Sequence, residues 1–118
     1  MAGKSVLLVG GTNTNRALLK AALEERSYRV SAAVLRKYTN HWLSRRIKAF
    51  DLIIYDLEEA EQPPEFWPDL RQSSNGSRII VVASAIDHSD YLTAGIDRVL
   101  RRPVSVGDII KESDLLLA

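Results

Sequence analysis

The chain has 118 residues, of which 46% are hydrophobic and 26% charged, and its net charge is +1. This composition predicts a single globular domain over residues 1–118, and the near-neutral charge gives no electrostatic basis for nucleic-acid binding. The sequence contains no cysteine, which excludes disulfides, zinc–thiolate centres and cysteine nucleophiles. Its apolar runs are too short for a signal peptide or for the roughly 18 residues of a membrane span, so we expect a cytoplasmic protein without a membrane role.

The first half of the chain alternates apolar runs with helical patterns. Residues 5–10, SVLLVG, are a short apolar run that ends in glycine and predicts a buried strand. An amphipathic helix is expected over 13–27, a second strand over 28–34 and a second helix over 39–50. Residues 51–57, DLIIYDL, predict a third buried strand.

The second half continues the alternation after a proline-rich loop. Residues 64–72 indicate a helical stretch within that loop, and 78–85, RIIVVASA, form the most apolar strand of the chain. A brief helix over 87–95, a short fifth strand over 97–103 and a last helix over 105–117 complete the pattern.

Polar residues mark the starts of two of these helices. Thr12, Asn13 or Thr14 can cap the first helix, because an N-cap side chain accepts a hydrogen bond from an otherwise unsatisfied backbone N–H. Ser105 and Asp108 have the spacing of a capping box at the start of the last helix.

Five apolar strands that alternate with helices predict an α/β fold of the flavodoxin-like (βα)5 type. Strands that are apolar throughout indicate a parallel sheet covered on both faces. Right-handed crossovers then favour a doubly wound sheet with the strand order 2-1-3-4-5. Ligands of such sheets bind at the carboxyl ends of the strands.

Residues with distinctive chemistry stand at those strand ends. They are Gly10 and Gly11 after the first strand, Asp56 at the third, Ser84 at the fourth and Arg102 at the fifth. A glycine pair before a helix can also cradle a phosphate, although the Gly10-Gly11 turn lacks the third glycine of GxGxxG and no GK[ST] follows it. A small nucleotide-binding domain that uses the Gly10-Gly11 turn is therefore one alternative.

Four segments, in this order, resemble the receiver domain of bacterial two-component response regulators, and the resemblance covers essentially the whole chain. The segments are LLVGGTNTNRALLKAALEERSYRV, FDLIIYDLE, IIVVASA and AGIDRVLRRPVS. The resemblance implies that Asp56 corresponds to the phosphoaccepting aspartate, and Ser84 and Arg102 to the hydroxyl and lysine positions of the phosphate pocket. It places Gly10 and Gly11 where an acidic pair normally helps to hold Mg²⁺. It also implies a cis peptide bond before the proline that follows Arg102, as is often found in the family.

The glycines depart from the family pattern in a way that bears on chemistry. Gly10 and Gly11 supply no carboxylate, and Mg²⁺ prefers octahedral coordination by oxygen, so Asp56 alone makes a poor magnesium site. We therefore expect no cofactor, with Mg²⁺ binding lost or weak. Arg102 keeps the positive charge of the family's lysine in a bulkier planar group. We expect it to form a salt bridge with Asp56, because a carboxylate at a buried strand end needs a partner.

Two further departures concern the face that receivers use for output. The family's aromatic residue on the last strand, whose rotamer reports phosphorylation, corresponds to Val99 here. The segment between Ser84 and Val99 is shorter than in most members, which predicts a shortened fourth helix.

The sequence thus favours a pseudo-receiver, a phosphorylation-independent interaction module of a bacterial two-component or phosphorelay pathway that is not an enzyme. The expected partner is a histidine kinase, an output domain or another signalling protein, and a homodimer is a further option. The nucleotide-binding domain is one alternative. A second is a genuine phosphoaccepting receiver that uses Asp56 and in which Arg102 takes over part of the role of Mg²⁺.

Overall fold

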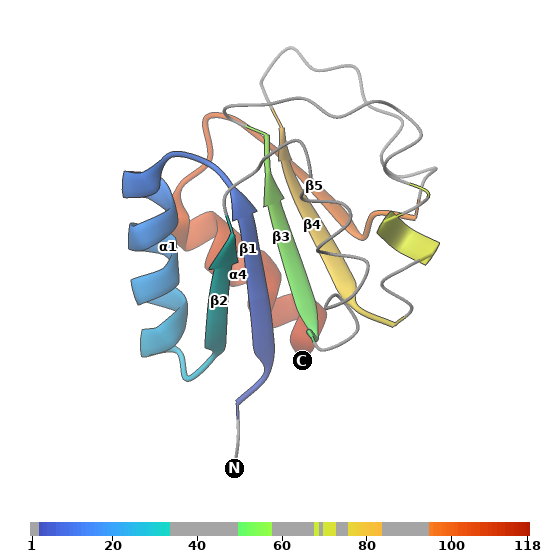
Figure 1. Ribbon diagram of the computed structural model, residues 1–118, viewed down its shortest axis with the longest axis horizontal. Coiled ribbons are helices and arrows are strands. Elements are labelled where there is room, and N and C mark those ends of the chain that lie inside the picture. The colour runs from blue at the N-terminus through green and yellow to red at the C-terminus, as the bar shows by residue number, and fades with distance from the viewer. Residues whose placement is uncertain (1–2, 34–49, 58–67, 69, 73–75, 84–94) are drawn as a thin grey trace.

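The computed structural model of the chain describes residues 3–33, 50–57, 68, 70–72, 76–83 and 95–118 (Figure 1). These residues contain a parallel sheet with the order β2-β1-β3-β4-β5. Its strands are β1 (Ser5–Gly10), β2 (Arg29–Ala33), β3 (Leu52–Asp56), β4 (Arg78–Ala83) and β5 (Arg98–Arg101). Each strand lies within its predicted range, and the predicted strand order is confirmed.

Two helices are described in full, α1 (Asn13–Glu25) and α4 (Val106–Leu117). Thr12 is the N-cap of α1, and its Oγ1 accepts a hydrogen bond from the Asn15 N–H at 3.1 Å. The predicted capping box of α4 is confirmed in both directions: the Asp108 N–H donates to Ser105 Oγ at 3.0 Å, and the Ser105 N–H donates to Asp108 Oδ2 at 3.2 Å. In the part of the chain that the structure describes, neither helix is long and apolar enough to cross a membrane.

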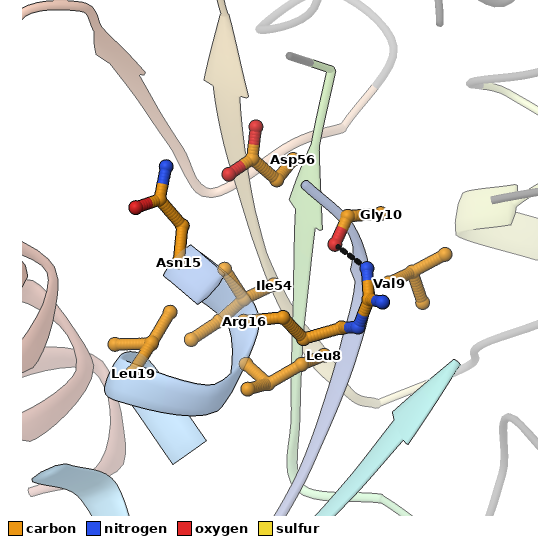
Figure 2. Close-up of a pocket in the computed structure, with 8 residues that line it drawn as sticks. All are labelled: Leu8, Val9, Gly10, Asn15, Arg16, Leu19, Ile54 and Asp56. Atoms are coloured by element: carbon orange, nitrogen blue, oxygen red, sulfur yellow. Dashed lines mark hydrogen bonds between the residues drawn. The ribbon is translucent and has the colours of Figure 1, made fainter. Parts of the chain in front are cut away.

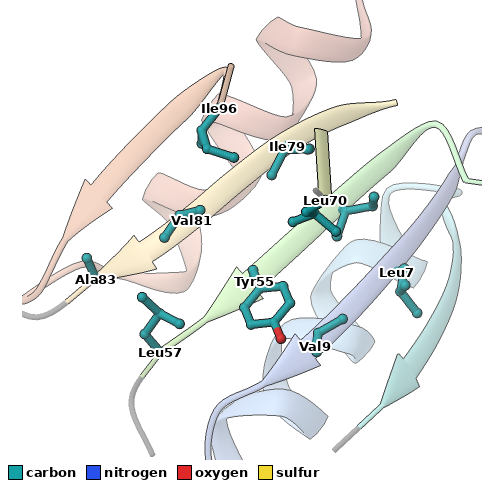
Figure 3. Close-up of a cluster of buried hydrophobic side chains, with 10 residues drawn as sticks. Leu7, Val9, Tyr55, Leu57, Leu70, Ile79, Val81, Ala83 and Ile96 are labelled. Atoms are coloured by element: carbon teal, nitrogen blue, oxygen red, sulfur yellow. The ribbon is translucent and has the colours of Figure 1, made fainter. Parts of the chain in front are cut away.

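The helices α1 and α4 cover the same face of the sheet. Leu19 and Leu23 of α1 and Ile109 of α4 pack there against strand side chains. The opposite face carries a second buried cluster (Figure 3), whose members are Leu7, Val9, Ile53, Tyr55, Leu57, Leu70, Ile79, Val81, Ala83 and Ile96. Successive strand residues therefore enter opposite cores, which explains why β1, β3 and β4 are apolar without alternation. Burial of each large aliphatic side chain contributes about 1.5–3 kcal/mol.

Some predicted helices concern residues outside those that the structure describes. The range 39–50 is described at Phe50 only, and 87–95 at Gly95 only. The shortened fourth helix therefore stays a prediction. Of the range 64–72, residues 68 and 70–72 are described, and they are helical as predicted.

Candidate functional site

The carboxyl ends of β1 and β3 lie level with each other. Gly10 and Asp56 are aligned partners in the β1–β3 register, and each is the last residue of its strand. Arg102 follows the last residue of β5, and its backbone N–H donates to the Ala83 carbonyl at the end of β4, at 3.0 Å. The sheet thus gathers Gly10, Asp56 and Arg102 at one edge, as the sequence predicted.

Arg102 forms an ion pair with Asp56. Its Nη2 donates to Asp56 Oδ1, and the two side chains are only 27% and 18% exposed. The predicted salt bridge is thus present in the structure. The peptide bond between Arg102 and Pro103 is cis, as the resemblance implied.

The loop after β1 approaches the same carboxylate from the other side. Gly10 and Gly11 have φ angles of 82° and 77°, a left-handed backbone conformation that favours glycine. A Cβ at position 11 would lie 2.9 Å from Asp56 Oδ2. The glycine at position 11 therefore lets the backbone pass close to the carboxylate, and an aspartate there would displace Asp56 or the loop.

Arg16, in the first turns of α1, binds the same loop. Its Nη1 donates to the carbonyl oxygens of Gly10 at 2.9 Å and Gly11 at 2.8 Å, and its Nη2 donates to Asn13 Oδ1. Figure 2 shows this side chain reaching back from the helix to Gly10, with Asp56 on the neighbouring strand. The sequence interpretation did not single out Arg16. The available signal was a cation near the N-terminus of a helix, where the helix dipole disfavours positive charge.

A small pocket adjoins these residues. It is lined by Leu8, Val9, Gly10, Asn15, Arg16, Leu19, Ile54 and Asp56 (Figure 2). Its volume of about 20 Å³ holds roughly one water molecule. This pocket among the described residues is by itself too small to hold a nucleotide.

The described residues at this end of the sheet do not by themselves fit a magnesium site of the receiver type. Among the described residues, no group of three or more His, Cys, Asp and Glu could hold a metal ion. One oxygen of Asp56 accepts from Arg102, and the carbonyl oxygens of Gly10 and Gly11 accept from Arg16. Since Mg²⁺ requires several oxygen ligands, a single carboxylate beside a guanidinium is a poor match.

Two of the remaining sequence predictions have different outcomes. Ser84 lies outside the described residues, so its place in the pocket stays a prediction. Val99 is part of β5 and packs, partly buried, against the cluster that contains Tyr55. An aliphatic side chain therefore occupies the position at which receivers usually carry an aromatic residue, as the sequence indicated.

Among known proteins, the chain is similar to solved structures only at the level of the fold. No family model matches the sequence, and no curated protein matches it. The receiver domain of TorR, a response regulator of the TMAO respiratory system, superposes with a TM-score of 0.78 at 22% identity, over 97% of this chain and 96% of that chain. The chain has the receiver fold. CheY4, a chemotaxis response regulator of Vibrio cholerae, gives a TM-score of 0.75 at 20% identity, over 97% of this chain and 98% of its own.

The receiver fold is also found in a protein named for a different process. The pilus assembly protein CpaE from Burkholderia thailandensis superposes with a TM-score of 0.73 at 19% identity, over 97% of this chain and 98% of that chain. A shared fold does not fix a shared function. The function of this chain is therefore argued from its own site.

Proposed function

We propose that this chain is a receiver-type signalling domain of a bacterial two-component or phosphorelay pathway, which acts by binding a protein partner without phosphorylation of Asp56. The observation that carries the proposal is the Asp56–Arg102 ion pair at the end of the sheet. The fold shared with receiver domains over nearly the whole chain supports the general class.

The surroundings of the two Asp56 oxygens support the finer statement. Oδ1 accepts from Arg102, and a Cβ at position 11 would lie 2.9 Å from Oδ2, so the β1–α1 loop passes near that oxygen. A carboxylate attacks a phosphoryl donor with one of these oxygens, so an incoming phosphoryl group would have to displace the guanidinium or the loop.

The shortage of positive charge at the site also argues against phosphorylation of Asp56. Phosphoryl transfer depends on positioning and on cations that neutralise the developing negative charge, and metal ions usually supply most of that charge. Here Arg102 supplies one positive charge, but Gly10 and Gly11 supply no acidic ligand for a metal. The site is then a permanent ion pair, and it neither gains nor loses charge in a phosphorylation cycle.

The partner is best sought among proteins of such pathways. A histidine kinase, an output domain, another signalling protein or a second copy of this chain would each suit a domain of this fold. The role proposed is that of a binding module and not of an enzyme, and it requires no cofactor.

Treatment with a small phosphodonor tests the proposal. The protein is incubated with acetyl phosphate and Mg²⁺, and its intact mass is measured, with a phosphorylatable receiver domain treated in parallel to show that the donor is active. We expect the mass to stay unchanged. A stoichiometric gain of one phosphoryl group that disappears in Asp56→Asn would establish the competing function, a genuine phosphoaccepting receiver.

A further inference from the structure

Arg16 makes an unusual set of contacts for a residue near the start of a helix. Its Nη1 donates to the carbonyl oxygens of Gly10 at 2.9 Å and Gly11 at 2.8 Å, and its Nη2 donates to Asn13 Oδ1. Hydrogen bonds from a charged donor are stronger than those between neutral groups. These three acceptors run from the last residue of β1 to the first residue of α1, so one side chain holds that turn from several points.

The helix itself gives no reason for a cation at this position. The positive end of the helix dipole lies at the N-terminus, and a positive side chain near it is disfavoured. The first turn of α1 also contains no acidic residue that could pair with Arg16. The hydrogen bonds to the loop carbonyls therefore account for its conformation better than any interaction within the helix.

The segment that Arg16 holds passes close to Asp56. Gly10 and Gly11 both have positive φ, and glycine has the widest conformational freedom of all residues. The backbone of Gly11 lies close enough to Asp56 that a Cβ there would be 2.9 Å from Oδ2. A glycine pair is free to leave this position unless something restrains it, and the two hydrogen bonds from Arg16 to the glycine carbonyls are such a restraint.

We propose that Arg16 is a positioning residue, which holds the β1–α1 loop against Asp56 and so limits access of reagents to that carboxylate. Arg102 neutralises the carboxylate from the β5 side, and Arg16 keeps the loop closed from the α1 side. The role of Arg16 does not depend on whether Asp56 ever accepts a phosphoryl group.

Carboxylate labelling of the folded chain measures that access. The wild type, Arg16→Ala and Arg16→Lys are treated with a water-soluble carbodiimide and glycinamide, and the modification rate of Asp56 is measured by peptide mass spectrometry. The rate is normalised to that of Asp108, an exposed carboxylate on α4. We expect Asp56 to be modified several-fold faster in Arg16→Ala, and Arg16→Lys to be close to the wild type because it keeps a charged donor.

Lys20→Ala is the matched control. Lys20 lies on the same helix one turn further along, and its Nζ pairs with Glu24, a further turn toward the end of the helix, at 3.2 Å. This variant loses a cation from α1, and we expect the Asp56 labelling rate to stay at the wild-type value. An equal acceleration in Lys20→Ala would show that charge on α1, and not the loop contact, is responsible.

Hydrogen exchange separates loop opening from general loss of structure. The amides of Asn15 and Arg16 donate to Thr12 Oγ1 and Thr12 O, and we expect both to exchange faster in Arg16→Ala while amides in the middle of α1 do not change. Equal Asp56 labelling in folded Arg16→Ala and wild type would overturn the proposal. If Arg16→Ala does not fold, the comparison of Arg16→Gln with Arg16→Lys decides, and equal labelling of Asp56 in these two variants would overturn it as well.

Phosphodonor treatment of the wild type distinguishes a failure of the Arg16 proposal from a failure of the function proposed above. Uptake of a phosphoryl group by the wild type would contradict a phosphorylation-independent domain and leave the labelling difference between Arg16→Ala and wild type standing. Unchanged labelling in Arg16→Ala would remove the role of Arg16 and leave the mass measurement on the wild type standing.

Discussion

The guanidinium of Arg102 reaches the carboxylate of Asp56 although β4 lies between the strands from which they come. The backbone of Arg102 is fixed to the end of β4 by its hydrogen bond to the Ala83 carbonyl. Because both side chains are mostly buried, solvent and salt screen this pair less than a surface pair. The removal of one partner then leaves a poorly solvated charge behind.

A double-mutant cycle on Asp56→Asn and Arg102→Met measures this coupling. We expect Arg102→Met to lower the free energy of unfolding by about 1–3 kcal/mol, and the two changes together to cost less than their sum, with a coupling of about 1–2 kcal/mol. The exposed pair Lys20–Glu24 is the control, with an expected coupling of about 0.3–0.5 kcal/mol. Urea unfolding gives all these values. A coupling for Asp56–Arg102 no larger than the control's would show that the partly buried pair stabilises the fold no more than an exposed pair does.

Gly11→Ala and Gly76→Ala separate backbone strain from the contact with Asp56. Both glycines have positive φ, of 77° and 101°, so alanine at either position costs about 1–2 kcal/mol of strain. A Cβ at position 11 meets Asp56 Oδ2 at 2.9 Å, whereas a Cβ at position 76 has nothing within 4 Å. We therefore expect Gly11→Ala to lose more stability than Gly76→Ala, as measured by urea unfolding. Equal losses would mean that Asp56 gives way to the new Cβ without cost.

Asp51 links the start of β3 to the start of β1 and makes stability depend on acidity. The Ser5 N–H donates to Asp51 Oδ2 at 2.8 Å, and this bond is the main reason that the pKa of Asp51 lies below its ordinary value of 3.8. The stabilisation is present above pH 3.8 and is lost as the pH falls through the lowered pKa. Urea unfolding against pH should show a shallower acid loss in Asp51→Asn than in the wild type. Parallel curves for the two proteins would contradict the assignment.

Tyr28 follows the end of α1 and donates a hydrogen bond to Asp114 of α4, and it makes stability depend on pH in the alkaline range. Burial, together with the hydrogen bond from its hydroxyl to Asp114, raises the pKa of Tyr28 from 10.0 to about 12. Since the raised pKa favours the neutral phenol in the folded state, the stabilisation is present below pH 10 and is lost as the pH rises toward 12. An absorbance titration of tyrosinate should show a step near pH 12 that is absent in Tyr28→Phe and moves down in Asp114→Asn. Loss of tyrosinate amplitude near pH 10, and not near pH 12, in Tyr28→Phe would contradict this.

The features that the sequence could predict depend on local pattern or on strand order. The capping role of Thr12 and the Ser105–Asp108 box follow from residue types at fixed short spacing. The meeting of Asp56 and Arg102 follows from the strand order, because the carboxyl ends of parallel strands share one edge of the sheet. Once the topology was predicted, these contacts required no knowledge of side-chain conformation.

The contacts that could not be predicted depend on how long side chains fold back or reach across elements. Arg16 turns toward its own preceding loop, and no residue pattern distinguishes that conformation from an extended one in solvent. Asp97 accepts from Arg71 at 3.1 Å and from the Ile79 N–H at 2.8 Å, although both partners are distant in the sequence. Such pairs depend on the packing of neighbouring elements, which hydrophobic periodicity does not describe.

A Mg²⁺ titration followed through the backbone amide signals of ¹⁵N-labelled protein tests the central claim most directly. If Arg102 on Asp56 and glycine at positions 10 and 11 leave no metal site, the amide signals of Gly10, Gly11 and Leu57 will stay in place as Mg²⁺ is raised through the millimolar range. The same titration of Arg102→Met shows whether the ion pair or the missing carboxylates prevent binding. Saturable shifts of these three signals in the wild type would contradict the account, because they would establish a working metal site beside Asp56.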